Sequence, residues 1–113
     1  MSRIYKLVPR WEWTAAKAAG VFLGSPVDVT DGFIHFSTAA QAGETARKYF
    51  AGLDDILVVA FEADDLGPGL KWEPSRGGDL FPHLYGPLDP KLALEERAAP
   101  LGKDGHIQLG DLA

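Results

Sequence analysis

The fold is decided by the stretch Ile56-Leu57-Val58-Val59-Ala60-Phe61, an unbroken apolar run that is rich in β-branched side chains. A run of this kind is typical of a β-strand that is covered on both of its faces. We therefore predict that residues 56–61 form the central strand of the sheet.

A strand and a helix are expected near the start of the chain. Residues 4–8 have the composition of a short strand, which Pro9 ends. The alanine-rich segment 10–19 has apolar residues near helical spacing, and Gly20 follows it where a left-handed C-terminal cap belongs. The sequence thus predicts a helix of about three turns over 10–19. Residues 23–32 have the composition of a loop.

A second strand is expected to run directly into a second helix. Residues 33–36 are apolar apart from one histidine, which predicts a strand. Thr38 and Gln41 then have the spacing of a capping box. We expect the helix to run from Thr38 to about Phe50 and to stop at Gly52.

After the central strand the pattern becomes that of shorter elements. Residues 64–69 predict a turn, and residues 70–73 alternate, which places Trp72 and Glu73 on opposite faces of a short strand. The segment 92–98 fits either a bulged strand or a short amphipathic helix, and we take it as a strand.

The C-terminal tail, residues 102–113, is rich in glycine and is expected to be flexible. Within it, residues 106–109 could add a last edge strand or be partly disordered. Strands before and after two helices, with the later strands clustered, predict a compact α+β fold. We expect one domain over residues 1–113.

Composition narrows the class of protein. A chain of 113 residues with 46% hydrophobic residues is large enough to bury one core. Its formal charge of -5 argues against broad binding to nucleic acid, because proteins that bind phosphate backbones usually carry a basic face. The absence of cysteine excludes disulfides, thiolate nucleophiles and cysteine-ligated metals.

The N-terminal segment and the longest apolar runs bear on export and membrane insertion. Residues 1–10 resemble a strand rather than a charged region followed by an apolar core, and no apolar run approaches ~18 residues. We therefore expect a soluble, cytoplasmic protein with no membrane contact.

Two short apolar segments, 31–38 and 81–88, each hold a histidine and are the best candidates for chemistry. An imidazole at His35, in an apolar strand, must find a hydrogen-bond partner. Prolines on both sides fix the backbone around His83, which suits the wall of a pocket. Glu73 lies ten residues before His83, close enough for a loop to bring both into one cleft.

Each candidate also has a purely structural explanation. His35 and His83 could be satisfied by backbone groups, and Glu73 could be solvated. Ser37 and Thr38 stand where a strand enters a helix, so they could cap the helix or help to bind anionic or carbonyl oxygens. Tyr85 could stack on a planar ligand or simply pack.

The sequence lacks the motifs of several familiar nucleotide-binding and catalytic sites. The chain has neither a phosphate-binding P-loop nor the glycine spacing of a dinucleotide fingerprint, and Ser37 lacks a glycine-flanked nucleophile elbow. A metal site stays open as an alternative, because His35, His83 and Glu73 could supply the two imidazoles and one carboxylate that bind iron.

The motifs themselves resemble a family of small bacterial and plant proteins of unknown function, over nearly the whole chain. They are IYKL at 4–7, GFIHFS at 32–37 with Gln41 after it, KWE at 71–73 and FPHLYG at 81–86. That family is grouped with the ADP-ribosyltransferase-like fold, a split β-sheet with flanking helices whose better-known members bind NAD in a cleft. The resemblance implies this fold and a cleft for NAD or an ADP-ribose-containing ligand.

The resemblance also implies roles for single residues. Glu73 and His83 would be catalytic in the transfer or removal of ADP-ribose, with Glu73 stabilising an oxocarbenium-like centre or orienting a nucleophile. The ligand-binding residues would be His35, Ser37, Thr38, Gln41 and Tyr85. The chain departs from well-characterised transferases in carrying Tyr5-Lys6 in its first strand and in lacking a Glu-x-Glu motif. The alternative is a noncatalytic module that binds a nucleotide or metabolite in the same cleft.

Overall fold

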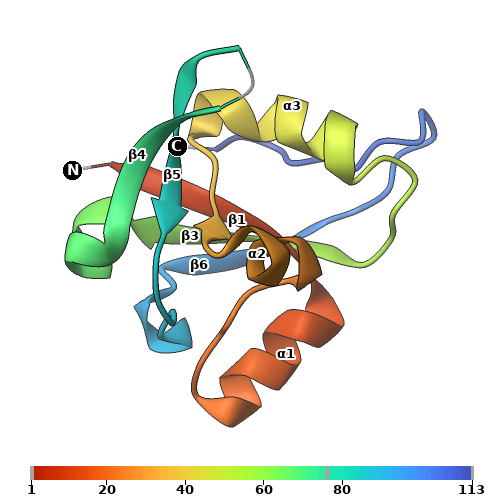
Figure 1. Cartoon of the computed structure of the whole chain (residues 1–113). Helices are drawn as coiled ribbons and strands as arrows, with labels where there is room; N and C mark the ends of the chain where they lie inside the picture. The colour runs from red at the N-terminus through yellow and green to blue at the C-terminus, as the bar shows by residue number, and fades with distance from the viewer. Residues whose placement is uncertain (1, 76, 113) are drawn as a thin grey trace.

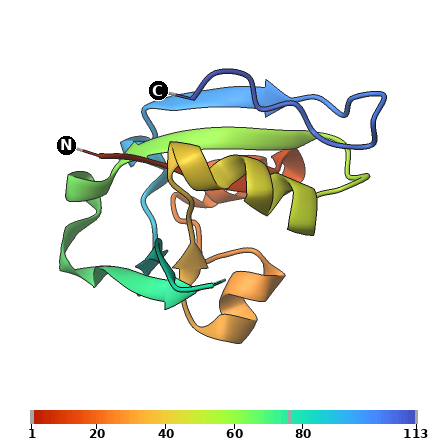
Figure 2. The same ribbon diagram turned by 90° about the horizontal axis from the view of Figure 1, so that it is seen from above.

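The computed structural model of the protein describes residues 2–75 and 77–112, which form two three-stranded antiparallel sheets with helices around them (Figure 1). The strands of the first sheet are, in spatial order, β1 (Arg3–Pro9), β3 (Ile56–Glu62) and β6 (Glu95–Ala99). Those of the second are β2 (Ile34–His35), β5 (Asp79–Leu84) and β4 (Leu70–Ser75). Figure 2 shows the two sheets as separate layers. An α+β architecture is therefore confirmed.

The predicted central strand is the centre of the first sheet. β3 pairs with β1 on one side and with β6 on the other, and each of residues 56–61 is less than 5% exposed. Leu57, Val59 and Phe61 face one apolar cluster, while the alternate residues face another. Burial on both faces explains why this run has no polar residue.

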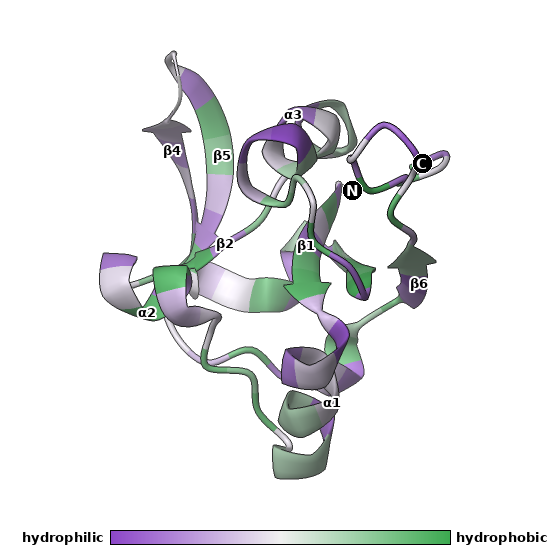
Figure 3. Cartoon of the chain, turned by 90° about the vertical axis from the view of Figure 1, so that its right-hand side faces the viewer, coloured by the Kyte–Doolittle hydropathy of each residue, from purple (hydrophilic) through white to green (hydrophobic). Residues whose placement is uncertain are grey.

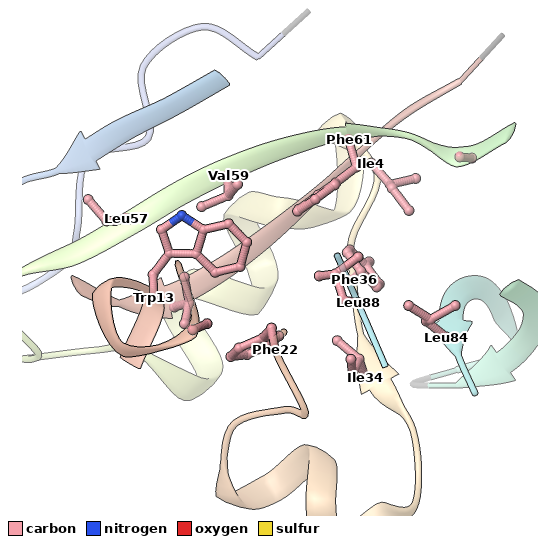
Figure 4. Packing of buried hydrophobic residues seen from close by; sticks show 13 residues of the cluster. Ile4, Trp13, Phe22, Ile34, Phe36, Leu57, Val59, Phe61, Leu84 and Leu88 are labelled. Atoms are coloured by element: carbon pink, nitrogen blue, oxygen red, sulfur yellow. The ribbon is translucent and has the colours of Figure 1, made fainter. Parts of the chain in front are cut away.

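The larger cluster lies between the two sheets, and Trp13 is fully buried in it (Figure 4). The indole packs edge-on against Phe22 and Phe61, with ring centroids 5.6 and 6.0 Å away. Aromatic pairs prefer such edge-to-face geometry. The cluster also contains Ile34 and Leu84 of the second sheet, so it holds the two sheets together.

Two of the helices form where the sequence predicts them. α1 is Arg10–Ala19, and its C-terminal cap Gly20 has φ of 81°, a left-handed conformation that glycine adopts without steric cost. α3 is Ala39–Tyr49, capped by Thr38, and it packs its buried alanines against β1 (Figure 1).

A third helix, α2 (Pro26–Asp31), occupies part of the segment that was predicted to be loop, so that prediction is wrong. The helix has a complete start signal: Ser25 and Asp28 form a capping box, and Pro26 stands at the first helical position. At six residues it is too short to show a helical period, and its valines hid the signal.

The first half of the second histidine segment, residues 81–84, belongs to a regular strand, which the prolines concealed. β5 lies between β2 and β4 although Pro82 has no amide hydrogen to donate. The carbonyl of Pro82 still accepts a hydrogen bond from the amide of Phe36, at 3.0 Å. Figure 3 shows the alternating hydropathy of β5 and the largely hydrophobic β1.

The C-terminal third contains one regular strand, which overlaps the strand predicted over 92–98. β6 covers Glu95–Ala99, and the residues just before it include a short 3-10 helix, Pro90–Leu92. Residues 106–109 form no regular strand; instead, buried Ile107 makes an isolated bridge to Leu101. No helix within 2–75 and 77–112 has the length and apolar character needed to cross a membrane.

Candidate functional site

A cavity of about 420 Å³ opens between the two sheets and is the candidate site. Its walls come from β1, the start of α2, the β2–α3 junction, the end of α3 and β5. The polar side chains that line it are Tyr5, Lys6, Glu12, Ser25, Asp28, His35, Ser37, Thr45, Tyr49, Ser75 and His83. This volume lies within the range of small-ligand sites.

The floor of the cavity contains a buried ion pair between Lys6 of β1 and Asp28 of α2. The Lys6 Nζ lies 2.8 Å from Oδ2 and 3.1 Å from Oδ1 of Asp28, and it donates to the carbonyl of His35 at 2.9 Å. The Asp28 side chain has no exposed surface. Burial lowers the pKa of Lys6, while the charge and hydrogen bonds of Asp28 oppose that change.

Asp28 connects three elements. Its carboxylate accepts the amide of Ser25 at 2.8 Å, the amide of His35 at 3.1 Å and a ring nitrogen of His35 at 2.6 Å, in addition to Lys6. Burial raises the pKa of Asp28, but the hydrogen bonds from His35 and Lys6 and the Lys6 charge lower it by more, to about 2 from 3.8.

The lowered pKa of Asp28 predicts acid sensitivity. The unfolded chain binds a proton at this carboxyl near pH 3.8, whereas the folded chain does so only near pH 2. The stabilisation is therefore complete above about pH 4 and is lost as the pH falls toward 2, by roughly 2 kcal/mol. Urea unfolding at steps between pH 5 and pH 2 measures this loss. The Asp28→Asn variant should lack this component, and an equal loss in both proteins would contradict the assignment.

His35 is held between two carboxylates. Its Nδ1 lies 2.6 Å from Asp28 Oδ1 and its Nε2 lies 2.9 Å from Asp31 Oδ2, the latter an exposed side chain at the end of α2. The sequence analysis considered a backbone group as the partner of the His35 ring. In the structure, the two ring nitrogens instead contact the side-chain carboxylates of Asp28 and Asp31. The ring is one-third exposed and lines the cavity.

His83 faces His35 across the paired strands and has a carboxylate partner of its own. Glu73 of β4 lies with Oε1 2.8 Å from the His83 Nδ1, and the Tyr85 hydroxyl donates to the same oxygen at 2.8 Å. These two bonds lower the pKa of Glu73, and the bond to Glu73 raises the pKa of Tyr85. Among the described residues, none bonds to Nε2 of His83.

Phe33 fixes the position of the second histidine from one side. Its ring stacks on His83 with centroids 4.1 Å apart and 28° between the planes, and it also contacts His35 and Tyr85. His83 itself is only 5% exposed. The imidazole is thus held by a ring on one face and by Glu73 at Nδ1, while the residue still lines the cavity.

Ser37 lies on the opposite wall and forms a hydroxyl pair with α3. Its Oγ is 2.9 Å from Oγ1 of Thr45, and Thr45 donates its hydroxyl hydrogen to the carbonyl of Gln41 at 3.2 Å. Either hydroxyl can be the donor in this pair, and Ser37 donates when the Thr45 hydrogen goes to the carbonyl of Gln41. At least one lone pair of Ser37 remains available to accept.

Thr38 and Gln41 form the capping box that the sequence indicates. Thr38 Oγ1 accepts the Gln41 amide at 3.3 Å, and Gln41 Oε1 accepts the Thr38 amide at 3.0 Å. The Gln41 side chain also donates to the carbonyl of Leu80 at 2.8 Å. Neither residue is among those that line the cavity, so their contacts support the structural explanation.

A substitution separates the capping role of Thr38 from a ligand-binding role. Thr38→Ala removes the cap of α3 and is expected to lower the free energy of unfolding by about 1 kcal/mol. Chemical denaturation measures this loss, with Thr14→Ala on the exposed face of α1 as the control. Unchanged stability of Thr38→Ala would contradict the capping role.

The structure brings together most, but not all, of the sequence candidates. His35, Ser37 and His83 line the cavity; Glu73 lies behind His83 and Tyr85 behind Glu73. Lys6, Asp28 and Phe33 were not foreseen. The signal for Lys6 was a lysine inside an apolar strand, which needs a buried acidic partner.

The metal alternative lacks a suitable ligand set. Within residues 2–75 and 77–112, no three histidine, aspartate or glutamate side chains converge closely enough to hold a metal ion. Glu73 contacts His83, while His35 is bound to Asp28 and Asp31 instead. The proposed set of two histidines and Glu73 therefore does not form.

The sequence matches the model of a known protein family. A family model described as "Protein of unknown function (DUF952)" matches residues 7–95. The chain belongs to the DUF952 family. The matched region contains Asp28, His35, Glu73 and His83, so both histidine–carboxylate contacts lie within the DUF952 part of the chain.

The chain is also similar to solved structures of a bacterial protein. The chain is 52% identical to protein CC0527 from Caulobacter crescentus, whose crystal structure matches with a TM-score of 0.93 over 96% of each chain. A solution NMR structure of CC0527 matches with a TM-score of 0.86 and 53% identity, over 97% of this chain and 95% of that one. No curated protein matches the sequence.

Proposed function

We propose that the cavity of this DUF952 protein binds the ribosyl end of an NAD-type nucleotide and supports the transfer or removal of ADP-ribose. The observation that carries the proposal is the Glu73–His83 pair on the wall of a cleft between two split sheets. The ADP-ribosyltransferase-like resemblance of the histidine motifs supplies the ligand class.

His83 is the residue suited to move a proton. Glu73 holds the hydrogen on Nδ1, which leaves Nε2 of the neutral ring as a base. In the proposed reaction the bond between C1′ of the ribose and the nicotinamide nitrogen breaks, and nicotinamide leaves with the electron pair. The oxygen of water or another acceptor bonds to C1′, and its proton passes to Nε2 of His83.

Glu73 acts through His83 in this scheme. It is not among the residues that line the cavity, and its carboxylate already accepts from His83 and Tyr85. Its lowered pKa keeps it charged at neutral pH, which stabilises an imidazolium as His83 takes the proton. Glu73 and Tyr85 are positioning residues in this scheme, whereas His35 and Ser37 would contact the ligand.

The first test is binding of NAD and of ADP-ribose, measured by thermal unfolding and titration calorimetry. A ligand at about 100 times its dissociation constant adds about 2.7 kcal/mol, a shift of several degrees for a domain of this size. His83→Ala should lose the shift, whereas His106→Ala, in the C-terminal tail outside the cavity, should keep it. No shift with either ligand at millimolar concentration would exclude the proposal.

The position of Glu73 also favours a second candidate, a module that binds the same ligand without turning it over. Glu73 does not line the cavity, so it could not itself contact an oxocarbenium-like centre; the carboxylates that line the cavity as described are Glu12 and Asp28, and each already accepts a hydrogen bond. Nicotinamide release from NAD, followed by chromatography, distinguishes the two functions. Binding without release would favour the module.

A further inference from the structure

Among the residues that the structure describes, Lys6 is the one lysine or arginine that lines the cavity, and all three of its ammonium hydrogens have partners. Lys6 has three hydrogens, and three oxygens lie within 3.1 Å of its Nζ: both carboxylate oxygens of Asp28 and the carbonyl of His35. An ammonium group committed in this way cannot also bind a phosphate without breaking a buried ion pair.

The backbone and side chains at the start of α2 are also committed. The amide of Ser25 donates to Asp28, and Pro26 has no amide hydrogen. The Ser25 hydroxyl donates to Glu12 Oε1 at 2.5 Å. Glu12 and Ser25 therefore present oxygen lone pairs to the cavity, and the Glu12 carboxylate adds a negative charge to this wall, near the Lys6–Asp28 ion pair.

The polar groups on the other walls of the cavity also offer mainly hydrogen-bond acceptors to a ligand. The Ser37 hydroxyl is paired with Thr45, and in either direction of that bond it keeps at least one lone pair that can accept a ligand hydrogen. The two ring nitrogens of His35 already face carboxylates, and the bond of Nδ1 to Glu73 makes Nε2 the acceptor in the neutral form of His83. The hydroxyls of Tyr5, Tyr49 and Ser75 complete the polar lining, and they carry no positive charge for a phosphate.

We infer that the cavity selects the nucleoside part of its ligand, a hydroxyl-bearing and neutral or cationic group, and leaves any phosphate outside. This inference rests on the proposed function and names its substrate class: an N-ribosylated heteroaromatic base, recognised through the hydrogens of its hydroxyl and amide groups. The acceptor groups of Ser37, Ser25 and Glu12 bind those hydrogens, and the Glu12 carboxylate favours a cationic pyridinium ring.

The test compares nicotinamide riboside, nicotinamide mononucleotide and NAD by titration calorimetry at one salt concentration. The riboside is a cation and the mononucleotide differs from it by one phosphate. We expect the riboside to bind at least as tightly as either phosphorylated ligand. A mononucleotide or NAD affinity more than about 10-fold above that of the riboside would overturn the inference but would leave the proposed function standing.

Two variants test whether Ser37 and Glu12 in the cavity bind the riboside. Ser37→Ala should weaken riboside binding by about 5-fold, the size of one hydrogen bond, whereas Thr14→Ala on α1 should leave it unchanged. Glu12→Gln should lower riboside affinity and raise mononucleotide affinity, because it removes a negative charge. Riboside binding that neither variant alters would overturn the inference, and binding of none of the three ligands would overturn the proposed function with it.

Discussion

Replacing Asp28 with asparagine is expected to lower the free energy of unfolding by about 3 to 5 kcal/mol, the largest stability effect of any polar substitution considered for this chain. The change leaves the Lys6 ammonium buried beside a neutral amide, at 4% exposure. It also replaces one of the two carboxylate oxygens that join α2 to β1 and β2 with an NH2 group, which cannot accept a hydrogen bond. Urea denaturation followed by tryptophan fluorescence measures the loss.

Two further variants test whether the buried charge is the cause. Asp31→Asn removes the other carboxylate that contacts His35, but Asp31 is exposed, so the cost should stay below about 1 kcal/mol. The double variant Lys6→Met, Asp28→Asn removes the orphaned charge and should be more stable than Asp28→Asn alone. A double variant that is less stable than the single one would contradict this explanation.

The predictable parts of the fold are those in which local chemistry and burial agree. The apolar run at 56–61, the helix ended by Gly20 and the capping box at Thr38 each specify one structure, and each forms as predicted. α2 and β5 were not predicted from the sequence. α2 is a short helix rich in valine, and β5 is a central strand that contains a proline. In β5, pairing with β2 and β4 outweighs the local preference of proline, whereas in α2 the local start signal outweighs the valine content.

The site was predictable in its histidines but not in their partners. His35 and His83 attract attention because an imidazole in an apolar segment needs a partner, and the structure supplies a carboxylate to each. Sequence separation could not indicate that Asp28 is the partner of Lys6, 22 residues away. Glu73 reaches His83 through strand pairing rather than through a loop, because the β4–β5 register places Lys71 opposite His83 and Glu73 opposite Phe81 on one face.

If the proposed reaction occurs, His83→Ala is expected to lower its turnover by about 10² to 10⁴-fold, the range for loss of a general base. Glu73→Gln should lower turnover by about 10²-fold, because the neutral amide no longer stabilises a protonated His83. Since Glu73 does not line the cavity, KM should change little while kcat falls. Nicotinamide release from NAD by each variant at saturating ligand measures these changes.

A tautomer measurement separates a positioning role for Glu73 from a merely structural one. In the wild type, the carboxylate of Glu73 should hold the hydrogen of neutral His83 on Nδ1, and long-range proton–nitrogen NMR spectra report which ring nitrogen carries it. Glu73→Gln should shift the population toward the other tautomer, since an amide can also donate to Nδ1. Glu44→Gln, which alters an exposed carboxylate on α3, is the matched control and should change neither the spectrum nor turnover. Two results together would show that Glu73 does not act through His83. The His83 tautomer would be unchanged in Glu73→Gln, and the fall in turnover would be no larger than the loss of folded protein accounts for.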